Sequence, residues 1–264
     1  MKSIFNKNSM VSRGCQAIAG LTLAMSAQLV QAGEVSVAVA ANFTAPMTQL
    51  AADFEQSSGH KLVLSYSASG RFYAQITNGA PFDVLLSADA GVPAKLIQEG
   101  KGVKGSQFTY AVGRLALWSA TPGFVDAQGN VLRLGQFRNV AIASPLLAPY
   151  GAAAMQTLEK LGLSATVVPK LVTGESIGQA FTMVATGNAE LGFVALSQVF
   201  AEGKFKTGSA WLVPAHLHSP LRQDAVLLTR GQSNPAAVSL LAFLKTEKAK
   251  TVMTSFGYEA PRDN

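Results

Sequence analysis

The 264-residue sequence predicts an α/β protein of two lobes, each a mainly parallel sheet flanked by helices. Strand-like apolar runs alternate with amphipathic helical stretches from residue 34 onward, the pattern of parallel strands joined by helices. Hydrophobic residues make up 48% of the chain and charged residues only 14%, which indicates a sizeable core and excludes a disordered chain. No Pro/Gly-rich linker is evident, so we expect β-segments to join the lobes.

The first 32 residues are typical of a secretory signal peptide. Three basic residues precede the apolar stretch 15–30, and Val30-Gln31-Ala32 has the small-x-small form of a cleavage site. We expect cleavage after about Ala32. The alternative, an N-terminal membrane anchor, is disfavoured because the apolar stretch is short and contains polar residues.

Cleavage changes the charge and the cysteine content of the mature chain. It removes three of the 21 basic residues and none of the 15 acidic ones, which leaves 18 against 15 and a net charge of +3. This modest charge gives little support to a nucleic-acid partner. Cys15, the only cysteine, also leaves, so the mature chain has no disulfide, thiol nucleophile or thiolate metal site. No later segment is long and apolar enough to span a membrane, and we expect a soluble exported protein.

Strands and helices alternate along the first third of the mature chain. The helix expected over 44–57 carries apolar side chains at helical spacing, and Gly59 ends it. Segment 109–120 is long for one strand, and it could cross from one lobe to the other. The other expected elements are strands at 35–41, 61–66 and 83–87 and helices at 71–78 and 92–99.

The same alternation continues to the C-terminus. The strand at 224–229 could return the chain to the first lobe, so the second lobe is predicted as an insertion. We expect lobe 1 to comprise residues 33–113 and 223–264, and lobe 2 residues 114–222. The remaining expected elements are strands at 139–143, 167–172, 190–196 and 211–213 and helices at 150–161, 177–186, 235–245 and 247–256.

Histidines give an enzyme hypothesis little support. His60 follows a helix-ending glycine and is expected in an exposed loop. His216 and His218 form an H-x-H pair, but no third metal ligand is near in sequence, and zinc sites need three or four. The nucleophile elbow, the phosphate-binding loop and the HExxH motif are all absent. An exported metal-dependent hydrolase therefore stays the less favoured alternative.

Four strand-to-helix turns carry neutral hydrogen-bond donors instead. A helix start exposes unpaired N–H groups and a partial positive charge, and parallel strands bring such starts to one edge of a sheet. Neutral donors suit a fully deprotonated oxyanion, whereas a protonated phosphate also needs an acceptor. Arg71 is the one cation close by in sequence, and we expect it to face solvent. The candidate ligands are Asn42, Ser69, Tyr150 and Ile177, with Ala41 and Gly70 as weaker candidates beside them.

These turns lie in segments that are characteristic along most of the mature chain. The segments are 39–44, 66–70, 140–151 and 190–194, together with Gly-Ala-Pro-Phe-Asp-Val-Leu-Leu-Ser-Ala-Asp at 79–89, which is the most specific. In these segments the chain resembles the molybdate-binding periplasmic protein family, the substrate-binding component of a molybdate ABC importer. The resemblance implies a type II periplasmic binding protein, in which two lobes trap a tetrahedral oxyanion between them.

The resemblance also implies a role for each candidate ligand. Asn42 stands where many members have a serine donor, and Ser69 would give its hydroxyl and its N–H. Tyr150 and Ile177 would give backbone N–H groups. Ala195 departs from the family, since many members place a tyrosine hydroxyl there, and the hydroxyl of Tyr150 could replace it.

The remaining expectations also follow from the resemblance. They are binding of molybdate and tungstate, a membrane permease as partner, a periplasmic location, a monomer, no cofactor and no catalysis. The metal would enter only as its oxyanion, with no direct cation ligands. The alternative within the binding class is a receptor for another tetrahedral oxyanion, such as sulfate.

Overall fold

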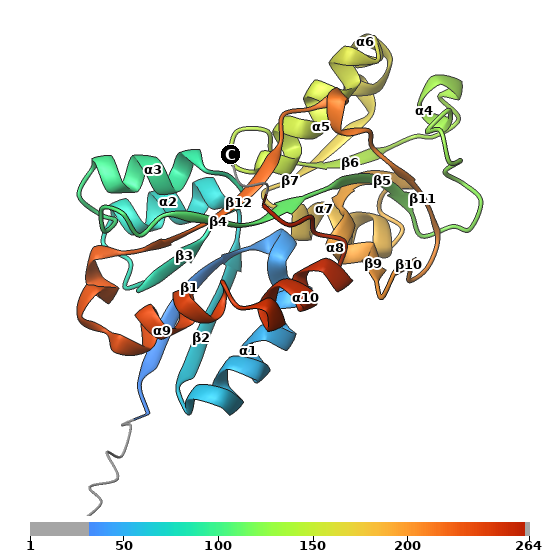
Figure 1. Cartoon of the computed structure of the whole chain (residues 1–264). Coiled ribbons are helices and arrows are strands. Elements are labelled where there is room, and N and C mark those ends of the chain that lie inside the picture. Colours follow the sequence, from blue (N-terminus) through green and yellow to red (C-terminus); the bar gives the residue numbers. More distant parts are fainter. Residues whose placement is uncertain (1–31, 262–264) are drawn as a thin grey trace, which may run out of the picture. The chain divides into compact units, whose positions relative to one another are not determined.

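A computed structural model describes residues 32–261 of the chain (Figure 1). The predicted signal peptide, except for Ala32, lies outside these residues. Within the described part, no helix is long and apolar enough to cross a membrane.

The first sheet forms the centre of lobe 1. It contains β1 (Glu34–Ala40), β2 (Lys61–Ser67), β3 (Val84–Leu86), β4 (Phe108–Gly113) and β12 (Leu221–Leu227). The order is β2-β1-β3-β12-β4, with β1 parallel to β2 and β3, and β12 antiparallel to β3 and β4. The strands β1, β3 and β12 are largely buried because helices cover both faces of the sheet, whereas the edge strand β2 has no buried residue.

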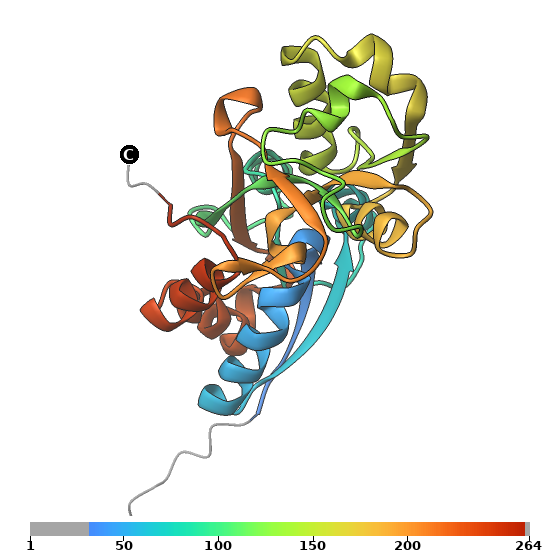
Figure 2. The same ribbon diagram turned by 90° about the vertical axis from the view of Figure 1, so that its right-hand side faces the viewer.

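Alternate residues of β1 show how the helices divide between the two faces. Val37 and Val39 pack in one core with residues of α1, α9 and α10, whereas Ala38 packs in another with residues of α2 and α3. Figures 1 and 2 show α1 and α10 together beside β1. These helices are α1 (Thr44–Ser58), α2 (Ser69–Thr77), α3 (Gly91–Gln98), α9 (Pro235–Phe243) and α10 (Glu247–Ser255), and the short turn η1 (Ala41–Phe43) precedes α1.

The second sheet forms the centre of lobe 2. It contains β5 (Leu115–Ser119), β6 (Val140–Ala143), β7 (Leu171–Gly174), β8 (Leu191–Ala195) and β11 (Ser209–Leu212), in the order β11-β5-β8-β6-β7. β6 is parallel to β7 and β8, and β5 is antiparallel to β8 and β11. The other elements of this lobe are α4 (Val131–Leu134), α5 (Pro149–Lys160), α6 (Ser164–Val167), α7 (Ile177–Ala185), α8 (Leu196–Val199) and the hairpin of β9 (Phe200–Ala201) and β10 (Lys204–Phe205).

The segment expected to be one long strand is two strands in different sheets. β4 ends at Gly113 and β5 begins at Leu115, so only Arg114 separates them. The chain returns between β11 and β12, and β12 begins at Leu221, earlier than the strand predicted from residue 224. The strands next to these crossings pair antiparallel, which makes both sheets mixed rather than wholly parallel.

Two local predictions from the sequence are wrong. Residues 167–172 were expected to form a strand, but a short turn, η2 (Val168–Lys170), follows α6, and β7 begins only at Leu171. Pro169 explains the difference, because proline has no N–H to donate to a sheet. His60, expected in an exposed loop, is only 8% exposed, and its Nδ1 accepts the Gly33 N–H at 3.1 Å.

Candidate functional site

One small pocket brings together all four residues that the sequence singled out as donors. Asn42 follows β1 and Ser69 follows β2 in lobe 1, while Tyr150 follows β6 and Ile177 follows β7 in lobe 2. The carboxyl ends of parallel strands from both sheets therefore face one point. We call this the interlobe pocket, and its lining is Ala40, Ala41, Asn42, Ser67, Ala68, Ser69, Ala88, Ala148, Pro149, Tyr150 and Ile177.

Helix starts at the pocket leave backbone N–H groups unpaired. No side chain caps η1, α2 or α5, and in α7 the Ser176 hydroxyl accepts only from the Gln179 N–H. Among residues 32–261, no protein acceptor is found for the backbone N–H of the four candidate donors. Unpaired N–H groups that converge in a pocket form a site for an anion.

Ser69 adds a hydroxyl to these donors. The side chain is almost fully buried, and its Oγ accepts the Ala88 N–H at 2.9 Å. That bond fixes the oxygen but uses a lone pair, so the hydroxyl proton stays available for an anion.

Gly70, a weaker candidate from sequence, does not line the pocket. Its N–H donates across to lobe 2, to the Leu147 carbonyl at 2.9 Å. A Cβ on Gly70 would lie only 3.1 Å from that carbonyl oxygen, closer than such contacts usually are. The absence of a side chain at Gly70 thus lets the lobes approach. Ala41, the other weaker candidate, does line the pocket.

The side-chain amide of Asn42 is hydrogen-bonded within the protein, so it is not the free side-chain donor that the residue type suggested. Its Nδ2 donates to Gln223 Oε1 at 2.7 Å and to Tyr258 Oη at 2.8 Å, which uses both amide hydrogens within the protein. The backbone N–H of Asn42 stays unpaired. Sequence reasoning missed Gln223 and Tyr258, and because Gln223 stands between Arg222 and Asp224 in β12, its residue type alone did not mark it as buried.

Tyr150 places its hydroxyl beside the crossing between the lobes. The Oη atom is buried and has no hydrogen-bond partner among the described residues, and a Cβ on Gly113 would collide with it. Burial raises the pKa of Tyr150 well above its usual value, so the hydroxyl stays neutral. Gly113 is not part of the pocket lining, and the structure places this hydroxyl against β4 and near the side chains of Tyr258 and Asn42.

Ala195, the departure from the family pattern, does not line the pocket either. Its N–H donates to Gln198 Oε1 at 2.9 Å, and Gln198 Nε2 donates to the Ile177 carbonyl at 3.1 Å. Gln198 thereby ties the end of β8 to the first residue of α7.

None of the described residues that line the pocket is charged. Arg71, expected to face solvent, is about half exposed and lies 3.6 Å from Glu175 of the opposite lobe. Arg71 follows Ser69 by two residues and Glu175 precedes Ile177 by two, so this ion pair belongs to the rim. The donors in the pocket are neutral N–H and O–H groups.

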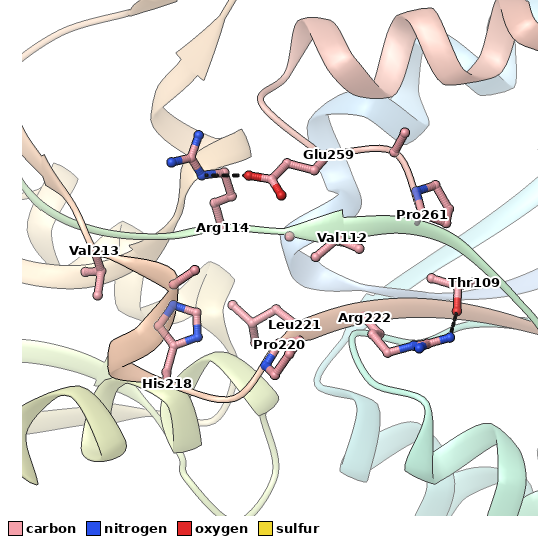
Figure 3. A pocket seen from close by; sticks show the side chains of 13 residues that line it. Thr109, Val112, Arg114, Val213, His218, Pro220, Leu221, Arg222, Glu259 and Pro261 are labelled. Carbon is pink, nitrogen blue, oxygen red and sulfur yellow. Dashed lines mark hydrogen bonds and ion pairs between the residues drawn. The ribbon is translucent and has the colours of Figure 1, made fainter. Parts of the chain in front are cut away.

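A second cavity, of about 310 Å³, lies at the crossing strands (Figure 3). Arg114 pairs with Glu259 at 3.4 Å, and Arg222 donates to the Thr109 hydroxyl at 2.7 Å. Of the H-x-H pair, only His218 lines this cavity. Within residues 32–261, no three His, Cys, Asp or Glu side chains lie together as metal ligands would, so a metal-dependent hydrolase gains no support there.

Comparisons with known proteins agree with an extracellular binding role. Residues 35–259 match the family described as bacterial extracellular solute-binding protein. Molybdate-binding protein ModA of Azotobacter vinelandii is 58% identical over 228 residues, 86% of this chain and 90% of that protein. The ModA of Rhodobacter capsulatus is 52% identical over 227 residues, 86% and 88% of the two chains. The solved Azotobacter vinelandii periplasmic molybdate-binding protein superposes with a TM-score of 0.83 at 42% identity, over 86% of this chain and all of that one.

Proposed function

This chain belongs to the bacterial extracellular solute-binding protein family, and we propose that it captures molybdate in the periplasm for an ABC importer. Two relatives that are 58% and 52% identical to it over 86% of its length are named molybdate-binding proteins. One observation in the structure supports the proposal most strongly: helix starts from two lobes converge, uncapped, on one uncharged pocket.

The chemistry of the lining favours a fully deprotonated tetrahedral oxyanion. Backbone N–H groups and the Ser69 hydroxyl can all donate, and no carboxylate lines the pocket to accept a proton from a protonated anion such as phosphate. Molybdate and tungstate have the same shape and charge, so we propose that both bind. No cofactor and no catalytic step enter this function.

We assign the ligands residue by residue. Asn42 and Ser69 of lobe 1 and Tyr150 and Ile177 of lobe 2 would each donate a backbone N–H, and Ser69 would add its hydroxyl. Each lobe supplies half of the backbone donors, so the full set forms only when the lobes are together. Separation of the lobes would release the ion to the permease.

Selectivity against sulfate would arise from the size of the ring of donors. An anion too small for the ring leaves buried donors unpaired, at a cost of about 1–3 kcal/mol each. Because the N–H groups belong to helices anchored in two sheets, the ring cannot contract freely around a smaller ion.

Calorimetric titration of the mature, monomeric chain tests the proposal. We expect tight binding of molybdate and tungstate, weaker binding of sulfate and none of phosphate. Tight binding of sulfate without molybdate would contradict it and identify a receptor for another oxyanion. The double change His216→Ala/His218→Ala is the matched control, since neither residue lines the interlobe pocket, and it should leave the affinity unchanged.

A further inference from the structure

Three buried polar side chains surround Asn42 and form with it a group of four. The four are Asn42, Ser197, Gln223 and Tyr258, which we call the Asn42 cluster, and each is at most 4% exposed. Of these, only Asn42 lines the interlobe pocket. Burying a polar group costs free energy unless the group is hydrogen-bonded, so the hydrogen bonds within this cluster show how its members are held.

Hydrogen bonds hold Asn42 in one orientation. Gln223 Nε2 donates to the Leu221 carbonyl at 2.9 Å, which leaves Gln223 Oε1 to accept from Asn42 Nδ2 at 2.7 Å. Tyr258 Oη accepts from the same Nδ2 at 2.8 Å and donates to the Asn42 carbonyl at 3.0 Å. Burial raises the pKa of Tyr258 to about 12, so the phenol keeps the proton that it donates. Side chain and carbonyl are thus both held, and the backbone N–H is left for the pocket.

The fourth member of the cluster comes from the opposite lobe. Ser197, in α8, donates its Oγ proton to the Asn42 carbonyl at 2.7 Å and lies 3.2 Å from Tyr258 Oη. Tyr258 packs in the core of lobe 1, whereas Ser197 follows β8 of lobe 2. This bond therefore joins the lobes at the residue whose N–H faces the pocket, and separation of the lobes must break it.

We infer that Tyr258 and Gln223 are positioning residues that orient the Asn42 N–H toward the oxyanion. Ser197, through its bond to the Asn42 carbonyl, makes this orientation depend on lobe closure. The inference rests on the proposed function and adds to it residues that never touch the ligand. When the Tyr258 hydroxyl is lost, Asn42 loses a partner on its amide and another on its carbonyl. The turn η1 is then free to shift, and the N–H no longer meets the anion at the right angle.

Tyr258→Phe against Tyr110→Phe is the matched comparison. Both tyrosines are buried and both pack edge-on against Phe43, with ring centroids 5.4 Å and 4.9 Å away. The hydroxyl of Tyr110, however, reaches only the Ser87 carbonyl, at 3.5 Å. Calorimetry with molybdate should show a Kd about tenfold higher for Tyr258→Phe and nearly unchanged for Tyr110→Phe. Ligand-free melting temperatures should fall more for Tyr258→Phe, whose hydroxyl makes two hydrogen bonds with Asn42, than for Tyr110→Phe, so the double-mutant cycle below is needed to separate positioning from stability.

A double-mutant cycle separates positioning from general stability. Gln223 contacts the site only through the Asn42 amide, so Gln223→Met should raise the Kd in the native chain but not in an Asn42→Ala background. Additive effects would overturn the positioning role, and this cycle decides the matter even if Tyr258→Phe fails to fold. Ser197→Ala should speed molybdate release in stopped-flow measurements, with little change in the association rate.

The outcomes also distinguish this inference from the proposed function. Equal Kd values for Tyr258→Phe and Tyr110→Phe, with tight binding by the native chain, would overturn the inference and leave the function intact. A native chain that does not bind molybdate would remove both. An unchanged release rate in Ser197→Ala would overturn the link to lobe closure alone.

Discussion

Ser69 supplies both kinds of donor at the pocket, a backbone N–H and a side-chain hydroxyl. Its N–H is at the start of α2, and its hydroxyl is fixed by the Ala88 N–H at 2.9 Å while keeping its own proton. A hydroxyl held in this way is already oriented for a charged acceptor, and such hydrogen bonds are stronger than those between neutral groups.

Ser69→Ala removes this hydroxyl and leaves the N–H in place. We expect molybdate binding to weaken by about 1–3 kcal/mol, measured by calorimetry. Ser106→Ala is the control, because the Ser106 hydroxyl is occupied by the Val103 carbonyl and the Leu227 N–H. An affinity as high as that of the native chain would remove Ser69 from the site.

Because of its buried tyrosines, the protein should lose stability as the pH rises in the alkaline range. Burial raises the pKa of Tyr150 and Tyr110 well above the usual value near 10, and that of Tyr258 to about 12. Above pH 10 the unfolded chain loses phenolic protons that the folded chain keeps, so the free energy of unfolding should fall as the pH rises. Denaturant melts between pH 8 and 11 measure this, and Tyr258→Phe should flatten the slope. A slope that Tyr258→Phe leaves unchanged would contradict this role of the buried phenol.

At the scale of the elements, a glycine at the end of β4 allows this strand to lie close to lobe 2. Gly113 is its last residue, and the Tyr150 hydroxyl of α5 occupies the space where a side chain would be. An aromatic ring buried at 1% exposure has little room to move. The crossing between the lobes and the start of α5 are therefore packed against each other.

Gly113→Ala should destabilise the fold by about 1–3 kcal/mol through overpacking. Tyr150→Phe in the same chain removes the atom that the new methyl group meets, so the double variant should recover much of the loss. Chemical denaturation of the two single variants and the double variant measures the coupling. Additive losses of stability would show that the new methyl group does not clash with the Tyr150 hydroxyl.

The helix starts at the pocket could be predicted from sequence because their signals are local. A strand pattern, a short polar turn and a helical pattern lie within about ten residues of each other, and such a run specifies the turn. The Asn42 cluster has no such signal. Gln223 and Tyr258 lie 181 and 216 residues from Asn42, and only the folded sheet brings them together. The prediction of a strand at 167–172 was wrong for another reason. Val167 and Val168 favour strands, but Pro169 has no N–H with which to pair in one.

At the scale of the whole molecule, three of the polar contacts between the lobes involve residues at or next to the pocket. Gly70 donates to the Leu147 carbonyl, Ser197 donates to the Asn42 carbonyl, and Arg71 pairs with Glu175. The first two are backbone-directed bonds, whereas the third is an ion pair whose side chains are 51% and 56% exposed. Exposed ion pairs contribute little and are screened by salt.

Arg71→Ala should therefore change molybdate release only slightly. We expect a small increase in the release rate at low ionic strength, in stopped-flow experiments, that disappears at high salt. Glu175→Ala should behave in the same way if the pair acts as a rim contact. A large loss of affinity in Arg71→Ala that persists at high salt would instead make Arg71 a ligand of the anion.

The uncharged lining of the pocket also governs the electrophoretic behaviour of the protein. None of the described residues that line it is a cation or an acid that could release or take up a proton near neutral pH. When a dianion enters, nothing in the site compensates its charge, and the complex carries that charge in full. The loaded form should therefore focus at a lower isoelectric point than the empty form in a native gel, which gives a direct count of occupied molecules without any label.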